Sequence, residues 1–290
     1  MTRRDLRERA EAAIAWLGYH AFGLLPVDIA SALGGWVGRV VGYRLPVTRF
    51  ARRNLARAYP EMGEAEREAL LVRMWDNLGR TIGEYPHAHR LPVGPGERIE
   101  LIGGEHVEAA RALGKGILFF GAHCGNWEVF GRVSTAFGLP VNLIYRAPNN
   151  PRTEWLFTGR GSRGGEMLPK GAKGARRAIE LLREGKALGM LLDQKMNDGI
   201  AVPFFGRDAM TAPALAQFAL KFGCPVLPGH VVRTKGAHLR LIIEPPLTPP
   251  ETADRHAAIL AMMTEVNRKI EGWVREHPDQ WLWLHRRWPD

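Results

Sequence analysis

The stretch that decides the fold spans residues 116–128 and reads Gly-Ile-Leu-Phe-Phe-Gly-Ala-His-Cys-Gly-Asn-Trp-Glu. It opens with a short apolar run of the length of a buried strand, and a polar segment that contains Gly125 follows directly. Asn126 is a good helix N-cap, so a helix is expected over residues 126–137. The stretch therefore predicts a strand, a turn and a helix in succession.

Further short apolar runs follow, and amphipathic helical segments separate them. This alternation is typical of an α/β sheet, in which ligands bind beyond the carboxyl ends of the strands. The residues directly after each run are therefore the candidate site residues. The predicted strands are Gly116–Phe120, Val141–Tyr145, Leu188–Leu192, Val226–Val232 and Leu239–Ile243, and the predicted helices cover 126–137, 172–184, 212–222 and 253–276.

The chain before residue 97 is predicted to be a helical extension, because no part of it shows sustained strand alternation. Helices are expected over 29–38, over a short arginine-rich stretch at 49–57, and over 64–84. A Pro- and Gly-rich cluster at 91–96 then marks a boundary. We predict a helical, membrane-associating region at 1–96 and an α/β region at 97–290, which ends in a helix and a Trp- and Arg-rich tail.

Residues 24–45 would make a helix of about 33 Å, long enough to cross a bilayer. Charged residues and a proline interrupt the apolar run, so a helix that lies in the membrane interface through Trp36 and Tyr43 is expected instead. A buried soluble helix is the alternative. Small residues recur every four positions along it and predict close packing against another helix. They are Ala30, Gly34, Gly38 and Gly42.

The composition indicates a polyanionic partner, because 40 Lys and Arg against 30 Asp and Glu give a formal charge of +10. Nucleic acid, an acidic protein and an anionic membrane all fit that charge. The two cysteines, Cys124 and Cys224, form neither a disulfide framework nor a zinc motif, which favours a reducing, cytosol-facing environment. The charged N-terminus lacks the apolar core of a secretory signal.

His123 and Glu128 are the candidate catalytic pair. On one continuous helix they would stand about 140° apart, so they meet only if His123 lies in the turn before the helix. A neutral imidazole can then take the proton of an alcohol while a carboxylate fixes its tautomer. A capping His and a Glu that favours a helix N-terminus are the alternative reading. Cys124 is a rival nucleophile, although it lacks an orienting group.

The segment 123–128, His-Cys-Gly-Asn-Trp-Glu, resembles the H-x4-D/E box of glycerolipid-type acyltransferases. Its Gly-Asn-Trp-Glu form is similar to the lipid A biosynthesis lauroyl and myristoyl acyltransferases, and the similarity extends along nearly the whole chain. The other matching segments are Arg52–Leu55 with Tyr59-Pro60, Ile144–Arg146, Asp193-Gln194, Val202–Gly206 and His277–Trp288.

The resemblance implies a mixed, mostly parallel sheet flanked by helices, with His123 as general base and Glu128 as its orienting partner. It implies that Arg146 holds the acceptor phosphate or the developing oxyanion, although a surface arginine has the same sequence appearance. Further substrate contacts would come from Asn126, Asp193, Gln194, Phe204, Phe205, Gly206, Lys170 and Lys173. Residues 202–206 would form an apolar, backbone-rich wall beside the acyl chain. The structural alternatives are loop caps for Asp193 and Gln194, and a β-turn with two core phenylalanines for 202–206.

Two basic segments have a functional and a structural interpretation. Arg160, Arg163, Lys170, Lys173, Arg176 and Arg177 suit an acidic carrier protein or a phosphorylated head group, and equally a solvated face. The three tryptophans of the tail, beside His285, Arg286 and Arg287, suit an interfacial belt or core packing. They are Trp281, Trp283 and Trp288.

The resemblance implies a transferase at the cytoplasmic face of the inner membrane. It would move a fatty acyl group from acyl carrier protein, or coenzyme A, to a hydroxyl of a lipid A precursor. Its partners would be the carrier protein, a membrane glycolipid and an anionic membrane surface, with no nucleic acid and no metal or tightly bound cofactor. Acylation of another glycolipid, such as a phosphatidylinositol mannoside, and a non-catalytic lipid- or nucleic-acid-binding module are the rival functions.

Overall fold

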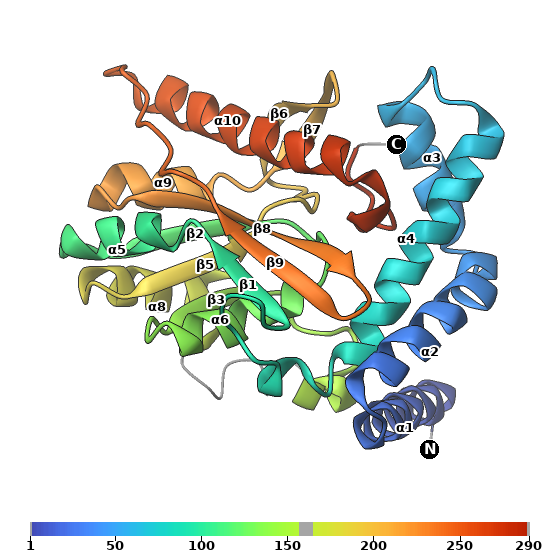
Figure 1. Cartoon of the computed structure of the whole chain (residues 1–290). Helices are drawn as coiled ribbons and strands as arrows, with labels where there is room; N and C mark the ends of the chain where they lie inside the picture. The colour runs from blue at the N-terminus through green and yellow to red at the C-terminus, as the bar shows by residue number, and fades with distance from the viewer. Residues whose placement is uncertain (1, 157–164, 289–290) are drawn as a thin grey trace.

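The computed structural model describes residues 2–156 and 165–288 and is built around a seven-stranded sheet (Figure 1). The strand order is β1-β9-β8-β2-β5-β3-β4. All neighbours are parallel except β8 and β9, which are antiparallel, so the predicted mixed, mostly parallel sheet is confirmed. The strands are β1 (Ile99–Ile102), β2 (Ile117–Gly121), β3 (Val141–Tyr145), β4 (Met167–Pro169), β5 (Ala187–Leu191), β8 (Val226–Lys235) and β9 (His238–Ile243).

Two strands of this sheet and a separate hairpin were not predicted from the sequence. β4 has only three residues, and β1 alternates polar and apolar residues at an edge, so neither forms an apolar run. The hairpin joins β6 (Ile200–Phe204) to β7 (Arg207–Thr211) through Phe205 and Gly206, which both have positive φ. Such a two-residue turn is typical of a tight β-hairpin.

Helices cover both faces of the sheet, and each face has its own core. On one face α8, α9 and α10 contribute to a large cluster that also contains Leu118, Leu188 and Val226. On the other face α5 and α6 pack over Ile99 and Ile117. These helices are α5 (Gly104–Ala112), α6 (Phe130–Ala136), α8 (Ala172–Arg183), α9 (Ala214–Phe222) and α10 (Arg255–Glu276).

Four N-terminal helices stack beside the sheet, at the right in Figure 1. α3 and α4 share the larger core, through residues such as Leu55 and Met74. Position 96 as a domain boundary therefore stays a prediction. The helices are α1 (Arg3–Leu24), α2 (Val27–Val40), α3 (Thr48–Ala58) and α4 (Glu64–Glu84), and short 3-10 turns are η1 (Gly42–Arg44), η2 (Ala88–Arg90), η3 (Trp127–Val129), η4 (Pro151–Thr153) and η5 (Pro278–Gln280).

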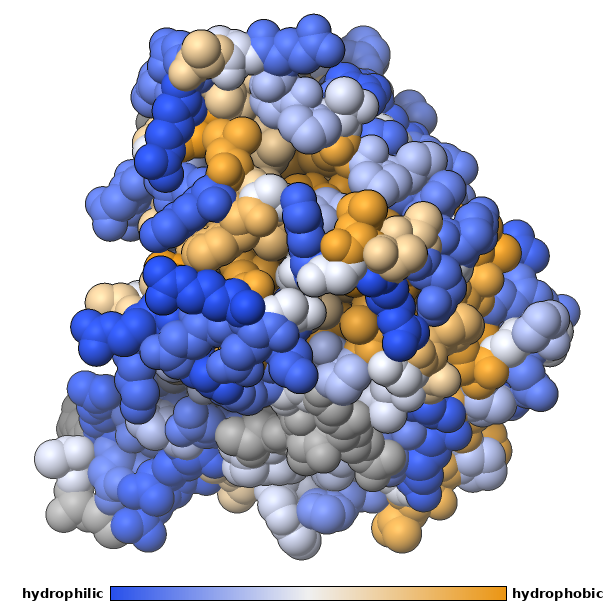
Figure 2. Space-filling model, turned by 90° about the vertical axis from the view of Figure 1, so that its left-hand side faces the viewer, coloured by the Kyte–Doolittle hydropathy of each residue, from blue (hydrophilic) through white to orange (hydrophobic). Residues whose placement is uncertain are grey.

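Helices α1 and α2 carry large apolar side chains in contact with solvent. The side chain of Trp36, which the sequence placed at an interface, is 52% exposed, whereas Tyr43 is half-buried and donates to Glu68 at 2.5 Å. Within the described part of the chain, no helix has both the length and the apolar character of a membrane span. Figure 2 shows the side remote from these helices, which is mostly hydrophilic with smaller apolar areas. The exposed apolar residues of α1 and α2 include Ile14, Trp16, Leu17, Leu24, Ile29, Leu33, Trp36, Val37 and Val40.

The row of small residues on α2 packs directly against α4, as the spacing predicts. A Cβ atom added to Gly34 would lie 2.2 Å from the carbonyl oxygen of Gly79, and one added to Gly38 would lie 2.0 Å from that of Trp75. Real side chains do not tolerate such distances, so the two helix backbones approach this closely only because these positions lack a Cβ.

We expect Gly34→Ala to lower the free energy of unfolding by about 2 kcal/mol or more, because its methyl group forces α2 away from α4. The melting temperature should fall by about 5 °C. Gly272→Ala on α10 is the control, since nothing lies within 4 Å of its added Cβ. Thermal unfolding followed by circular dichroism measures both. Equal melting temperatures for Gly34→Ala and the wild type would contradict the close packing.

The tryptophans of the C-terminal tail belong to the core. Trp281 and Trp283 are fully buried and Trp288 is nearly so. Trp281 and Trp283 pack edge to face with ring centroids 4.6 Å apart, and Trp288 donates to the carbonyl of Phe204 at 3.1 Å. Their side chains are engaged inside the protein, so core packing is the correct interpretation and the interfacial belt is wrong.

Stability should depend on pH through His230, which is 5% exposed and stacks on Trp273 with ring centroids 4.6 Å apart. Burial lowers the pKa of His230 to about 4; Glu244 opposes this, while His277 and Lys269 add to it. In the unfolded chain the pKa returns to about 6.5. The unfolded state thus binds more protons between these values, and stability falls as the pH drops from 6.5 towards 4.

Between pH 6.5 and 5 the wild type should lose about 2 kcal/mol of stability through His230. We expect His230→Phe, which keeps the stacking, not to lose this part. The fall in melting temperature over this range should shrink by about 4 °C. Melting curves at both pH values provide the measurement. The same fall in both proteins would show that His230 titrates normally in the folded state.

Candidate active site

His123 and Asp193 meet because they follow neighbouring parallel strands. Strands β2 and β5 pair with Gly121 opposite Leu191. His123 and Asp193 each lie two residues beyond that pair, so both lie at the same height beyond the carboxyl edge of the sheet. His123 Nδ1 and Asp193 Oδ1 are 2.8 Å apart, and the His123 backbone amide donates to Asp193 Oδ2 at 2.9 Å.

Asp193 is buried and fully engaged by donors. Its side chain is 0% exposed, and its Oδ2 also accepts a hydrogen bond from Trp281 Nε1 at 2.8 Å. Burial alone would raise the pKa of this carboxyl, but the charge and hydrogen bond of His123 hold it well below its ordinary value. Asp193 is therefore an anion that fixes the ring of His123, with Nδ1 carrying the proton and Nε2 left as the acceptor nitrogen that can act as a base.

On the side of its Nε2 atom, the His123 ring contacts Gln194 and His285. Gln194 Nε2 lies 3.3 Å from His123 Nε2 and 3.2 Å from His285 Nε2, so one amide bridges the two imidazoles. The ring centroids of His123 and His285 are 4.9 Å apart. Burial, and then the neighbouring His123, lower the pKa of His285 to about 4. At pH 7 His285 is neutral and accepts a hydrogen bond from Gln194.

The turn at Gly125 and the N-cap at Asn126 lie where the sequence predicts them. Gly125 has φ +56°, and a Cβ atom there would lie 2.4 Å from the carbonyl oxygen of Val231. Asn126 caps the following helix, because its Oδ1 accepts from the Glu128 amide at 3.2 Å. The helix begins as the 3-10 turn η3 and continues as α6.

The partners of His123 differ from the predicted pair. Asp193 occupies the position on Nδ1 that we predicted for Glu128, while Glu128 lies in the wall of the same cavity as His123. A direct part for Glu128 in catalysis stays a prediction. Asn126 is not a substrate ligand: it is 0% exposed, with Nδ2 bonded to Glu84 at 2.7 Å.

A cavity of about 400 Å³ opens beside His123. Its polar end is formed by His123, Gln194, Arg146 and Lys170. From there it runs between the sheet and α6 along apolar side chains that include Phe119, Phe130, Val133, Leu139, Leu241 and Ile243. Aromatic side chains of the helical region, Tyr19 and Tyr85, also line it. The cavity thus combines a basic, hydrogen-bonding end with an apolar slot.

Two cations lie at the polar end. Arg146 follows β3, is exposed, and donates to Asn149 Oδ1 at 3.3 Å. Lys170 follows β4 and is exposed as a residue, but its ammonium group is partly desolvated; this desolvation, and then the charge of Arg146, lower its pKa. Both residues follow strands, as expected for a ligand site at the carboxyl edge of a parallel sheet. An anionic ligand placed between them would relieve their mutual repulsion.

Several other predicted site residues lie elsewhere. Phe204 and Phe205 are buried in the aromatic cluster under α10, so they do not form the wall of the slot, and Gly206 turns the hairpin. Lys173 is exposed on α8, outside the cavity lining. Arg177 pairs with Glu166, Glu180 and Glu184, which reduces the positive charge of this segment. Arg160 and Arg163 lie outside the described residues.

Cys124 is unsuited to nucleophilic attack. It is 4% exposed, and burial, then the charge of Asp193, raise the pKa of its thiol well above the ordinary value. A thiolate at this position is disfavoured at pH 7, and the thiol form is a poor nucleophile. Among the described residues Cys124 is the only thiol beside His123, and it acts as a small buried side chain rather than as a nucleophile.

Among the residues of the site that were not predicted from the sequence are Trp281, His285 and Tyr19. They come from the C-terminal tail and from α1, more than 80 residues from His123 along the chain. The motif-like tail at 277–288 was the available signal, but its tryptophans had two interpretations. Only the packing of the tail against the segments that follow β2 and β5 brings Trp281 and His285 to His123, and Tyr19 reaches the cavity from α1.

Comparisons with known proteins identify the family of this chain. The family model described as bacterial lipid A biosynthesis acyltransferase matches residues 3–290. The lipid A biosynthesis lauroyltransferase of Escherichia coli is 29% identical over 290 residues, which cover 94% of this chain and 90% of the relative. The palmitoleoyltransferase of the same organism is 26% identical, over 94% and 90% of the two chains.

A solved structure shows a weaker similarity. The 1-acyl-sn-glycerophosphate acyltransferase of Thermotoga maritima aligns with a TM-score of 0.40 and 15% identity, covering 85% of this chain and 97% of the other. The family match, in contrast, spans the helical region, the sheet and the tail, and so includes every residue around the cavity. The chain belongs to the bacterial lipid A biosynthesis acyltransferase family.

Proposed function

We propose that this acyltransferase moves a fatty acyl group from acyl carrier protein to a hydroxyl of a lipid A precursor. The observation that carries the proposal is the position of His123, fixed by a buried carboxylate at the junction of a basic recess and an apolar slot. The slot suits a hydrocarbon chain, and the recess suits the phosphorylated sugar of the acceptor.

The reaction proceeds by direct attack. Nε2 of His123 takes the proton of the acceptor hydroxyl while its oxygen forms a bond to the thioester carbonyl carbon. The tetrahedral intermediate collapses, the carbon–sulfur bond breaks, and the thiolate takes the proton back from the imidazolium ion. The products are an ester and a free thiol, and neither a protein nucleophile nor a metal or bound cofactor enters these steps.

The described side chains supply the charges that the steps require. Asp193 stabilises the imidazolium that forms, because it stays ionised beside Nδ1. The amide of Gln194 and the ammonium group of Lys170 border the same space and are the donors for the developing oxyanion. Arg146 is assigned to the acceptor phosphate, because its side chain is exposed and the phosphate can reach it.

The reaction is proposed to take place at the cytoplasmic face of the inner membrane. The support comes from α1 and α2, where exposed apolar residues such as Trp16, Leu33 and Trp36 accompany a chain of net charge +10. An amphipathic surface of this kind binds an anionic membrane by combining apolar burial with electrostatic attraction. Tyr19 on α1 also lines the cavity, so the helix that carries part of this surface also reaches the cavity.

The membrane proposal is tested with vesicles that contain phosphatidylglycerol. We expect Trp36→Glu to reduce binding about tenfold, because a charge replaces an apolar anchor. Leu113→Glu is the matched control: Leu113 is 60% exposed but follows α5, away from α1 and α2. Equal binding by both variants would remove the role assigned to α2.

The function is tested by assaying the purified protein with acyl carrier protein and coenzyme A donors and with two acceptors, a lipid A precursor and a phosphatidylinositol mannoside. We expect the carrier protein and the lipid A precursor to give the highest kcat/KM. The mass of the product should increase by one acyl group. Preference for the mannoside would overturn the acceptor, and preference for coenzyme A would overturn the donor.

A further inference from the structure

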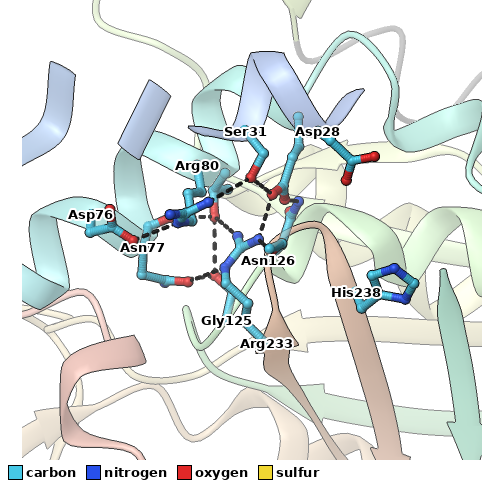
Figure 3. Close-up of polar contacts among 12 residues, drawn as sticks. Asp28, Ser31, Asp76, Asn77, Arg80, Gly125, Asn126, Arg233 and His238 are labelled. Carbon is cyan, nitrogen blue, oxygen red and sulfur yellow. Dashed lines mark hydrogen bonds and ion pairs between the residues drawn. The ribbon is translucent and has the colours of Figure 1, made fainter. Parts of the chain in front are cut away.

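A buried polar network lies behind the 123–128 turn and joins it to α2 and α4 (Figure 3). Its centre is Glu84, the last residue of α4, which is 0% exposed. The Glu84 carboxylate accepts hydrogen bonds from Ser31 Oγ at 2.6 Å and from Asn126 Nδ2 at 2.7 Å. The guanidinium group of Arg233 on β8 forms an ion pair with the same carboxylate. One carboxylate therefore connects two helices, a strand and the turn.

Arg233 extends the network to the backbone of the turn. Its Nε donates to Asn77 Oδ1 at 2.8 Å, and a terminal nitrogen donates to Thr81 Oγ1 at 3.3 Å. Asn77 Nδ2 in turn donates to the carbonyl oxygen of Gly125 at 3.0 Å, and the Thr81 hydroxyl lies 3.2 Å from the same oxygen. The network thus holds Gly125 by its backbone and Asn126 by its side chain.

The turn depends on these side chains for its shape. Gly125 stands in the left-handed region, and Asn126 has φ −113° and ψ 80°, so neither residue continues β2 or the helix that follows. Asn126 also caps Glu128 through Oδ1. A displacement of its amide would therefore move the backbone on both sides, towards His123 and towards Glu128.

A buried ion pair is a poor means of stabilisation, because the cost of removing two charges from water offsets most of their attraction. Apolar residues of similar volume stabilise a fold about as well. What the ionic network adds is a single arrangement of donors and acceptors around the turn. An apolar replacement of the ion pair can therefore keep the stability and still lose this arrangement. A positioning role and a structural role can thus be distinguished by experiment.

We propose that Glu84 is a positioning residue for acyl transfer: its carboxylate, paired with Arg233, holds the Gly125–Asn126 turn so that His123 faces the cavity correctly. The inference rests on the proposed role of His123 as the base. Loss of the network should lower kcat and leave KM for the donor nearly unchanged, because neither Glu84, Arg233 nor Asn126 lines the cavity.

The test compares three variants at a temperature at which each is fully folded. Glu84→Gln removes the charge and leaves Arg233 unpaired, so it should reduce kcat by about 10- to 100-fold and also destabilise the protein. The double variant Glu84→Gln/Arg233→Met removes both charges and should recover stability without recovering kcat. Ser31→Ala removes only one donor to the carboxylate and should lower kcat by about threefold.

Glu68→Gln is the matched control. Glu68 lies on the same helix, α4, and its carboxylate pairs with Arg52 on α3 and accepts from Tyr43, so it has no contact with the residues that hold the turn. It should change stability and leave kcat within about twofold. If the double variant has the kcat of the wild type, Glu84 has only a structural role. If the double variant does not fold, Ser31→Ala decides in the same way. If His123→Ala stays active, the role of the base fails instead.

Discussion

His123→Ala is expected to reduce kcat about 10²- to 10⁴-fold while the protein keeps its fold. The substitution removes the base that takes the hydroxyl proton, and no other described imidazole replaces it. His285, the nearest, lies with its ring centroid 4.9 Å away and is held by Gln194. The measurement is the initial rate of ester formation with saturating donor and acceptor. KM for the donor should change little, since the apolar slot is unaffected.

The fold of this variant is checked by circular dichroism and by its melting temperature. His256→Ala is the control for a histidine substitution as such, because His256 is exposed on α10. It should have the rate of the wild type. A folded His123→Ala protein with more than about a tenth of the wild-type rate would exclude His123 as the general base.

Asp193→Asn is expected to reduce kcat on the order of 10³-fold, because the amide cannot hold the same tautomer and cannot stabilise the imidazolium ion. The loss of an anion that accepts from His123 and Trp281 should also destabilise the fold by about 1–3 kcal/mol. Rates must therefore be compared well below the melting temperature. Asp198→Asn, at an exposed position of the same loop, should leave both rate and stability unchanged.

The same variant distinguishes Asp193 from Glu128 as the partner of His123. A proton in the Nδ1 hydrogen bond should give a downfield resonance in the proton NMR spectrum of the wild type and of Glu128→Gln. It should be absent from Asp193→Asn. The opposite pattern would return the orienting role to Glu128, as the sequence motif predicted.

The predictions that succeeded rest on local signals. The 188–192 run and the helix at 64–84 lie within one residue of the observed β5 and α4, because apolar periodicity and flanking breakers define such elements. The turn at Gly125 and Asn126 was also predicted correctly, since both residue types have strong conformational preferences. β1 and β4 were missed because three or four residues give too short a pattern, and the hairpin was missed because Pro203 interrupts the apolar run of β6 and β7 has no such run.

The partner of His123 was missed because it depends on strand order. Asp193 lies 70 residues from His123 along the chain, and it reaches Nδ1 only because β5 is the neighbour of β2 with Gly121 opposite Leu191. Apolar runs predict strands but not which strands pair. Glu128 was the only carboxylate that the local spacing placed near the imidazole. The network around Glu84 was missed for the same reason, since its members come from α2, α4, β8 and the turn.

The contribution of the tail has a consequence for biosynthesis. A ribosome makes residues 281–288 after every other part of the site, yet Trp281 donates to Asp193 and Asn54 binds the carbonyl oxygen of His285. The nascent polypeptide therefore stays inactive until that segment emerges from the exit tunnel and closes over the sheet. Truncated translation products that lack it are expected to expose aromatic surface and to be removed by proteases rather than to acylate lipid prematurely.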